Sequence, residues 1–424
     1  MNKEKQKIVP ELRFPDFSKN WEMKNLGDCI EIKGRIGYRG YTVKDIVKKG
    51  EGAIAMSPSN IDVSGILSFN RTTYISWFKY EESPEIKLKD GYTVLVKTGS
   101  SYGKSTLIKN LPEKCTINPQ LVVLKPTNIN AVFLSLLVSH STIQTQISNT
   151  IVGGAIPTLS QGSLSKFRIA LPEPKEQKKI VNCISSLDDT IAMEMEKLEL
   201  LNDHKKGLLQ KLFPDEGEKN PQFRFSEFEN DKDWEISTLN EISSSVFDGT
   251  HQTPKYTDKG IPFFSVENIV SGRKNKFISR EDYLYETRNN KPEFEDVLIT
   301  RIGNIGTPKV VDWEYEFSIY VTLAVVKKSE KFDSYYLQAY IQSSRFQNEI
   351  RRRSLLKAAP CKINMDELRK CEVLLPSDKK EQQKIAKCIS SADELIESQT
   401  KKIKALKKHK KGLMQQLLPN VNNL

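Results

Sequence analysis

A stretch of 39 residues occurs twice in this chain and constrains its fold more than any other feature. Residues 176–214 and 381–419 align without a gap at an offset of 205, and 20 of the 39 positions are identical. Because this offset has the size of a domain, the repeat indicates duplication of a large unit and not a solenoid of short repeats.

Each copy of the repeat predicts one long helix. Apolar residues recur at alternating steps of four and three over 180–212 and again over 385–417, which is a heptad seam. About 38 residues make a helix of roughly 57 Å, and a narrow seam of that length requires a partner of equal length. We therefore expect the two helices to pair as a coiled coil, in preference to the alternative that each is a core helix of its own domain. Both copies place polar residues at the same two seam positions, where they can fix register: Glu194, Lys205, Gln399 and Lys410.

The segments ahead of the helices repeat more loosely. Short β-branched runs bounded by Gly, Pro and Asn predict strands over 52–61, 94–97 and 121–125, with counterparts over 260–269, 297–300 and 323–327. Helices are expected over 131–151 and 334–353. The sequence thus predicts an α+β fold in which each globule is followed by a long helix. The expected boundaries are 1–171 for the first globule, 172–214 for the first long helix, 215–375 for the second globule and 376–424 for the second long helix.

Charge and cysteine usage narrow the class of protein. A net charge of +11 with a pI near 9.1 favours a polyanionic partner. The six cysteines are scattered and include no CxxC pair, which argues against a zinc site or a disulfide framework. No run of 18 apolar residues is present, so we expect no membrane span, no signal peptide and a cytoplasmic location.

No catalytic constellation stands out in the sequence. The stretch Gly99–Thr106 is similar to a P-loop but has three residues between its glycines where the motif needs four. Its counterpart around Gly303 lacks the Lys-Ser pair, so a glycine turn that offers cations to phosphates is the better interpretation. We expect no catalytic residues, no metal ligands and a binding function. Two alternatives stay open: a fused methyltransferase or nuclease component with its own catalysis, and a purely structural coiled-coil adaptor.

The globules differ most in their loops. Residues 34–42 of the first and 248–254 of the second share the frame but not the sequence, which suggests two modules that do the same job on different targets. Polar side chains in these loops or beside glycine turns can donate hydrogen bonds to base edges or phosphates. The candidate DNA-binding residues are Arg35, Tyr38, Arg39, Lys97, Tyr102, Lys104, Thr250, His251, Gln252, Lys255, Arg301 and Asn304.

Taken together, two variable α+β globules, each followed by a near-identical long helix, resemble the DNA-specificity subunit of type I restriction–modification enzymes. The resemblance covers essentially the whole chain. It is carried by Pro10–Phe17 with Trp21, by Asp248–Pro254 with Gly260–Phe263, by Glu176-Gln177 and Glu381-Gln382, and by His204–Leu212 and His409–Leu417. The resemblance implies two target recognition domains, each reading one half of a bipartite site in double-stranded DNA. It also implies an antiparallel pairing of the long helices with a pseudo-twofold repeat, so that helix length sets the unread spacer.

The resemblance further implies partners for this chain. Two methyltransferase (modification) subunits that use S-adenosylmethionine and restriction subunits that translocate and cut DNA with ATP and Mg²⁺ are expected to assemble on it, while the chain itself binds no cofactor. The glycines Gly207 and Gly412 lie inside the helices, where glycine costs roughly 1 kcal/mol relative to alanine. They suggest close approach of another helix, the alternative being a shared ancestral accident. The candidate partner-binding residues are Glu176, Gln177, Gly207, Glu381, Gln382 and Gly412.

Overall fold

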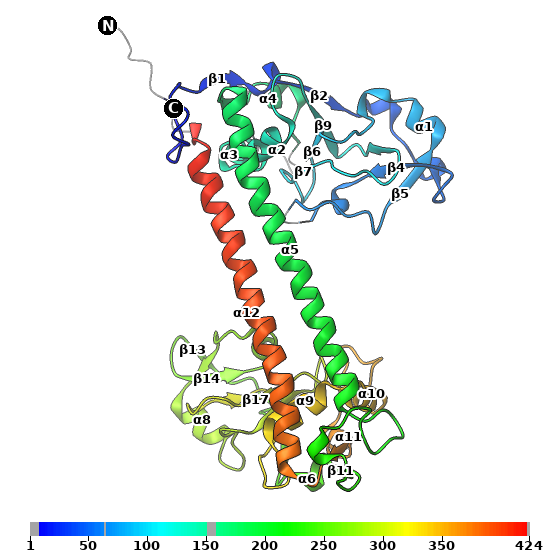
Figure 1. The fold of residues 1–424 in the computed structure, drawn as a ribbon, viewed down its shortest axis with the longest axis vertical. Coiled ribbons are helices and arrows are strands. Elements are labelled where there is room, and N and C mark those ends of the chain that lie inside the picture. Colours follow the sequence, from blue (N-terminus) through cyan, green and yellow to red (C-terminus); the bar gives the residue numbers. More distant parts are fainter. Residues whose placement is uncertain (1–7, 63–64, 151–157, 422–424) are drawn as a thin grey trace. The chain divides into compact units, whose positions relative to one another are not determined.

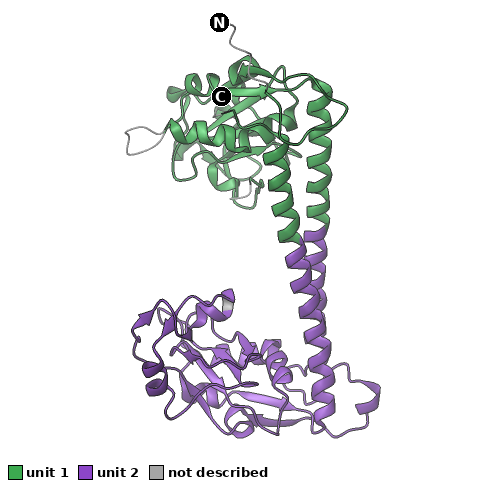
Figure 2. Ribbon diagram, turned by 90° about the vertical axis from the view of Figure 1, so that its left-hand side faces the viewer, with its two compact units in different colours: residues 1–193, 403–424 green, residues 194–402 purple. Residues whose placement is uncertain are grey.

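The computed structural model describes residues 8–62, 65–150 and 158–421. The chain forms two compact units, unit 1 with residues 1–193 and 403–424, and unit 2 with residues 194–402 (Figure 2). Two unbroken helices of 39 residues each, α5 (Pro174–Leu212) and α12 (Lys379–Leu417), pass through both units (Figure 1). Their equal length and their offset of 205 confirm the two predicted long helices.

Unit 1 contains three small sheets. The first has the strand order β2-β9-β6-β7, the second β3-β5-β4-β8, and β1 pairs with β10. The strands are β1 (Glu22–Asn25), β2 (Ile30–Gly34), β3 (Ile46–Val47), β4 (Gly52–Met56), β5 (Thr73–Ser76), β6 (Thr93–Val96), β7 (Ser105–Leu107), β8 (Cys115–Ile117), β9 (Leu121–Pro126) and β10 (Arg168–Leu171). The shorter helices are α1 (Trp77–Glu81), α2 (Ala131–Ser139), α3 (Ser141–Asn149) and α4 (Gln161–Ser165).

Unit 2 repeats this topology. Its sheets have the orders β12-β19-β16-β17, β13-β15-β14-β18 and β11-β20. The strands are β11 (Glu235–Thr238), β12 (Val246–Asp248), β13 (Tyr256–Thr257), β14 (Ile261–Phe264), β15 (Phe277–Ile278), β16 (Val297–Thr300), β17 (Pro308–Val310), β18 (Ser318–Ile319), β19 (Leu323–Val326) and β20 (Glu372–Leu375). The helices are α6 (Leu239–Ile242), α7 (Val266–Ser271), α8 (Arg280–Glu286), α9 (Ser334–Gln342), α10 (Ser344–Arg352) and α11 (Met365–Arg369). The predicted α+β class and the internal repeat are therefore confirmed.

Two details of the predicted elements are wrong. The helices expected over 131–151 and 334–353 are each broken once, because His140 and Ser343 are extended and cap a second helix with their side chains. The strands expected over 52–61 and 260–269 end at Met56 and Phe264. After them, a serine and an asparagine three residues later form a capping box that starts a short helical turn.

The first turn of each long helix is tied to its own globule. The Glu176 carboxylate, 1% exposed, accepts two hydrogen bonds from the Arg13 guanidinium at 2.8 Å each. In unit 2 Arg224 donates in the same way to Glu381, which is also 1% exposed. Hydrogen bonding to these carboxylates raises the pKa of both arginines above its usual value. These bidentate, shielded pairs fix where each helix begins.

The neighbouring glutamines repeat the same duplication. The Gln177 side chain accepts from the amide of Asn130, at the start of α2, and donates to Pro172 O. Gln382 makes the equivalent bonds with the amide of Asp333 and with Pro376 O. Each glutamine therefore joins its long helix to the helix pair that covers the sheet.

The main core of each unit is completed by the end of the other repeat's long helix. In unit 1, Leu417 and Leu418 pack with Ile180 and with residues of β10. In unit 2, Phe213 packs with its ring against Trp234, Tyr336 and Tyr340. The ends of both helices are thus buried in hydrophobic cores.

The long helices pair antiparallel through the predicted polar seam positions. In unit 2, the Gln399 amide donates to the Glu194 carboxylate at 2.6 Å, and Lys205 forms an ion pair with Asp393. In unit 1, Lys410 forms the equivalent ion pair with Asp188. Rising numbers on α5 meet falling numbers on α12, which confirms the antiparallel coiled coil.

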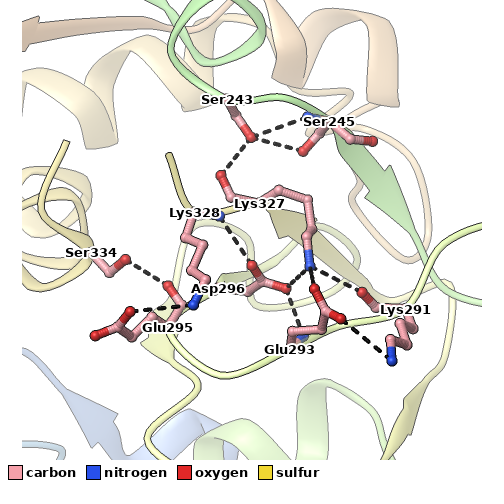
Figure 3. Close-up of polar contacts among 9 residues, drawn as sticks. All are labelled: Ser243, Ser245, Lys291, Glu293, Glu295, Asp296, Lys327, Lys328 and Ser334. Carbon is pink, nitrogen blue, oxygen red and sulfur yellow. Dashed lines mark hydrogen bonds and ion pairs between the residues drawn. The ribbon is translucent and has the colours of Figure 1, made fainter. Parts of the chain in front are cut away.

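A charge network around the buried Asp296 lies at the end of β19 in unit 2. The Lys327 ammonium contacts the carboxylates of Glu293 and of fully buried Asp296 at 2.7 and 2.8 Å (Figure 3). The hydrogen bond from Lys327 lowers the pKa of Glu293 below its usual range. At the equivalent position of unit 1, Lys125 lies 5.6 Å from the centroid of the Tyr92 ring. The shared frame is thus stabilised by different chemistry in the two units.

Candidate nucleic-acid interface

A glycine turn follows the same strand in both units. Gly99 and Gly103 connect β6 to β7, and Gly303 and Gly306 connect β16 to β17, all four with positive φ. In each unit a glutamine side chain donates a hydrogen bond to the carbonyl of the second glycine. Gln144 of α3 donates to Gly103 at 3.0 Å, and Gln347 of α10 donates to Gly306 at 2.8 Å. These turns are therefore rigid supports for the residues beside them.

Lys97 and Arg301 occupy equivalent positions, one residue after the strand that precedes the glycine turn. Their backbone amides donate to Gln120 O and Thr322 O, respectively, at 2.9 Å. Gly34 of β2 and Asp248 of β12 are equivalent as well, because they pair with Val122 and Ala324 at matching places in the sheet. The two units therefore differ at two equivalent positions. Unit 1 has lysine and glycine there, and unit 2 has arginine and aspartate.

Arg301 is an internal cross-link. It is 6% exposed, and its guanidinium donates to the Asp248 carboxylate at 2.7 Å and to the carbonyls of Val321 and Ile363. The same Asp248 oxygen lies 3.1 Å from Nε2 of His251, whose side chain is exposed. Burial lowers the pKa of Arg301, while Asp248 opposes this shift. Arg301 thus positions the loop that carries His251, and it does not itself reach the surface.

Arg35 has a similar internal role in unit 1. It is 6% exposed and donates to the carbonyl of Ile117, to Thr116 Oγ1 and to the carbonyl of Arg39. Its guanidinium also lies 5.5 Å from the centroid of the Tyr41 ring. Both guanidinium groups donate hydrogen bonds inside the globule, and the direct DNA contact predicted for Arg35 and Arg301 stays a prediction.

Lys97 differs from both arginines. Its ammonium group has no hydrogen-bond or ion-pair partner among the residues that the structure describes, and burial lowers its pKa. A Cβ placed on Gly34 would lie 3.5 Å from its Nζ, where unit 2 has Asp248. Lys97 is therefore a half-buried cation that lacks a counter-charge among the described residues.

The other predicted residues lie at loops around these positions. Tyr38 is 80% exposed, with Arg39 near its ring. The hydroxyl of Tyr102 contacts Thr150 Oγ1 at 3.1 Å, so this side chain also supports α3. Lys104 is half-buried beside the same turn. In unit 2, Gln252, Lys255 and Asn304 are exposed and Thr250 is half-buried, its hydroxyl accepting from the Gln252 amide. Their contact with DNA stays a prediction.

The residues predicted to bind partners fall into two groups. Glu176, Gln177, Glu381 and Gln382 are at most 3% exposed and hold each globule to its helix, so their internal role follows from the contacts. Gly207 and Gly412 are different, because a Cβ at either position would meet no described atom within 4 Å. Close approach of the paired helix therefore does not explain these glycines, and contact with another subunit stays a prediction.

Sequence reasoning missed several residues that shape this interface. In the sequence Asp248 stands only as part of a loop, whereas in the structure it joins Arg301 to His251. Arg13 and Arg224 recur at matching places ahead of the repeated Glu-Gln pairs, and this co-occurrence of a cation and an acid in both copies was a usable signal. The glutamines Gln144 and Gln347 had no comparable signal, because their contact with the glycine turn depends on how α3 and α10 pack.

The described residues offer neither a metal site nor a membrane span. Over residues 8–62, 65–150 and 158–421, no group of three or more His, Cys, Asp or Glu side chains could hold a metal ion. Within the same ranges, no helix is both long and apolar enough to span a bilayer.

Comparison with known proteins agrees with this architecture. The chain is 25% identical to the type I restriction enzyme MjaVIII specificity subunit of Methanocaldococcus jannaschii, over 96% of this chain and 93% of that protein. It is 26% identical to the MjaX specificity subunit of the same organism, over 98% and 96%. The fold resembles the crystal structure of the S subunit of a type I restriction-modification system from M. genitalium, with a TM-score of 0.58 at 16% identity, covering 98% of this chain and all of that one.

A family model matches most of the chain. The type I restriction modification DNA specificity domain matches twice, over residues 18–203 and 231–408. Each match spans one globule and most of the long helix that follows it, in agreement with the duplicated topology. The chain therefore belongs to the family of type I restriction-modification DNA specificity proteins.

Proposed function

We propose that this chain is the DNA-specificity subunit of a type I restriction–modification enzyme and that each unit reads one half of a bipartite site. The observation that carries this proposal is the contrast between frame and loops. The two units share strand order, glycine turns and helix clamps, yet differ at Lys97 and Arg301 and at Gly34 and Asp248. A shared frame with different polar groups at one edge suits two readers of different base sequences.

The proposed reading surface combines exposed loop residues with rigid supports. His251 and Gln252 are exposed on a loop that Asp248 and Arg301 hold in place. In unit 1, Lys97 supplies a donor that has no partner within residues 8–62, 65–150 and 158–421, and it lies beside a glycine turn held by Gln144. Lysine and histidine donors of this kind fit acceptors on base edges or phosphates.

The long helices would set the length of the unread spacer between the half-sites, which we call the ruler role. They would also provide the surface on which the other subunits dock. Helices of 39 residues are each about 58 Å long at 1.5 Å per residue, which is ample for half-sites about 34 Å apart. Two methyltransferase subunits would use S-adenosylmethionine to methylate one adenine in each half-site, which requires the base to leave the stack. Restriction subunits would supply ATP-driven translocation and cleavage. This chain would bind no cofactor and would act on DNA in the cytoplasm.

Exchange of the reading loops tests this proposal. Residues 245–310 of unit 2 are replaced by the matching stretch of a relative with another target, and methylated adenines are mapped by sequencing in cells that carry the methyltransferase subunits. We expect one half-site to change and the other to remain. The matched control exchanges residues 31–107 of unit 1 and should change the other half-site. A change of both half-sites, or of neither, in folded and active chimeras would contradict the proposal.

A further inference from the structure

Four lysines form a stripe on α12 that the equivalent part of α5 lacks. Lys404, Lys407, Lys408 and Lys411 follow the spacing i, i+3, i+4 and i+7, which places them on one face of the helix. All four side chains are exposed, and all lie in the part of α12 that belongs to unit 1. We call this set the lysine stripe. The adjacent seam residues Ile403 and Leu406 are more buried than the four lysines.

The paired helix shows that the stripe is not required for the coiled coil. The positions of α5 that the repeat aligns with it carry two acids, one neutral residue and one lysine: Glu199, Asn202, Asp203 and Lys206. Of the other 35 aligned positions of the repeat, 19 are identical, and both helices have the same length. The stripe therefore carries a charge of +4 where its counterpart carries −1.

The lysine stripe also lacks internal compensation. Neighbouring lysines on the same helix are paired, Lys401 with Glu397, Lys402 with Glu194 and Lys410 with Asp188. The four lysines of the stripe form no ion pair with any residue that the structure describes. Like charges at i,i+3 and i,i+4 repel one another and destabilise a helix. A stripe of four lysines is therefore expected to interact with a negatively charged partner outside the helix.

The spacing of the stripe fits a nucleic-acid backbone. Seven residues from Lys404 to Lys411 rise about 10 Å along the helix, which gives roughly one positive charge per 3.5 Å. Each strand of duplex DNA carries one phosphate per about 3.4 Å of helix axis. We propose that the lysine stripe binds phosphates of duplex DNA without reading bases, in addition to the contacts made by the globules. This inference rests on the proposed DNA-binding function and deepens it.

Salt-dependent DNA binding tests the lysine stripe directly. The full chain and its K404Q/K407Q/K408Q/K411Q variant are titrated with a cognate and a scrambled duplex over a range of salt concentrations. Each lost phosphate contact reduces the slope of log K against log salt by about 0.9. We therefore expect the slope to become less negative by about three to four, with equal loss of affinity for both duplexes. The K404R/K407R/K408R/K411R variant should keep the slope.

A matched control removes the same charge elsewhere. Exposed Lys175, Lys178, Lys380 and Lys387 form no such stripe, and K175Q/K178Q/K380Q/K387Q should change the slope by less than half as much. An unchanged slope in the folded stripe variant overturns the inference. Loss of methyltransferase-subunit binding with an unchanged slope also overturns it and identifies a protein surface. A wild-type chain without preference for the cognate duplex would instead contradict the proposed function.

Discussion

Lys97 and Arg301 show how one position can serve two purposes. Both follow the strand that leads into a rigid glycine turn, but only Arg301 has an acidic partner, Asp248. A buried arginine that donates to Asp248 and to two backbone carbonyls acts through the loop that it holds. A half-buried lysine without a counter-charge lowers its free energy when an anion or a base acceptor approaches it.

We predict opposite effects for the two positions. Lys97→Met should leave folding intact and cost about 1–3 kcal/mol of discrimination at one half-site, because a donor to a base edge is lost. Arg301→Met should lower the free energy of unfolding by about 3–5 kcal/mol, because it leaves Asp248 without its partner. DNA-binding titrations and urea unfolding separate the two effects. Lys97→Arg is the conservative control, and a Lys97→Met variant with unchanged site preference would contradict the assignment.

His140 makes the stability of unit 1 depend on pH. Its Nδ1 accepts from the amide of Thr142 at 3.3 Å and caps α3, and the side chain is 4% exposed. Burial lowers its pKa below the ordinary value. In the unfolded chain His140 takes up a proton near pH 6.5, whereas the folded protein resists protonation there.

The folded state therefore loses stability as the pH falls below about 6.5. The loss should approach about 1.4 kcal/mol per pH unit until the lowered pKa of His140 is reached. Denaturant unfolding of the wild type between pH 7.5 and 5 measures it. His140→Ser copies the Ser343 cap of unit 2 and should remove most of this dependence. An equal pH dependence in that variant would assign the effect to other groups.

At the scale of elements, the polar seam residues determine the register of the two long helices. Glu194 meets Gln399, its own counterpart in the repeat, and the pairs Lys205–Asp393 and Lys410–Asp188 flank this contact. A shift by one heptad would separate these partners and leave charges beside apolar seam positions. Polar residues in a seam fix register in this way at some cost in stability.

A deletion that keeps the heptad phase tests whether the length of the helices sets the spacer. Removal of Glu194–Leu200 together with Gln399–Ala405 shortens both helices by seven residues and leaves the outer seam in phase. We expect the spacer of the methylated site to change while the bases of both half-sites remain, as read by sequencing of methylated adenines. Deletion of four residues from each helix is the control, because it breaks the phase and should abolish assembly. An unchanged spacer in an active variant with the seven-residue deletions would show that helix length does not set the spacer.

At the scale of the whole molecule, each repeat requires the other to complete its core. Phe213 ends the first repeat but lies among aromatic rings of unit 2, and its counterpart Leu418 lies in the core of unit 1. Both are at most 2% exposed. The two sequence repeats therefore exchange helix ends, and neither repeat has a full core by itself.

Truncation of these side chains should be costly. We expect Phe213→Ala to lower the free energy of unfolding by about 3–5 kcal/mol and Leu418→Ala by about 2–5 kcal/mol, because each leaves a cavity. Met193→Ala, at a side chain that is 62% exposed, is the control and should change it by less than about 0.5 kcal/mol. Urea unfolding measures all three. Losses below 1 kcal/mol at both buried positions would show that the helix ends are not part of these cores.

Much of this architecture could be predicted from the sequence. Heptad spacing and an offset of 205 residues predicted two helices of equal length. Helical periodicity is a local property, because it depends only on residues a few positions apart in the sequence. The α+β order and the weaker repeat of the globules followed from short β-branched runs. The helix breaks at His140 and Ser343 could not be predicted in this way. There a side chain caps a second helix instead of continuing the first, and the local sequence pattern does not reveal which of the two occurs.

The chemistry of the interface was decided by tertiary structure. Arg35, Lys97 and Arg301 all read as exposed basic residues in the sequence, yet two of them are buried cross-links and one is an unpaired cation. The difference depends on whether a carboxylate or carbonyl from a distant strand lies within hydrogen-bonding distance. By itself, the sequence determined the duplicated frame and the helical seam, because their signals are periodic and local. Only the folded chain determined which polar groups are used internally, because that depends on residues tens of positions apart.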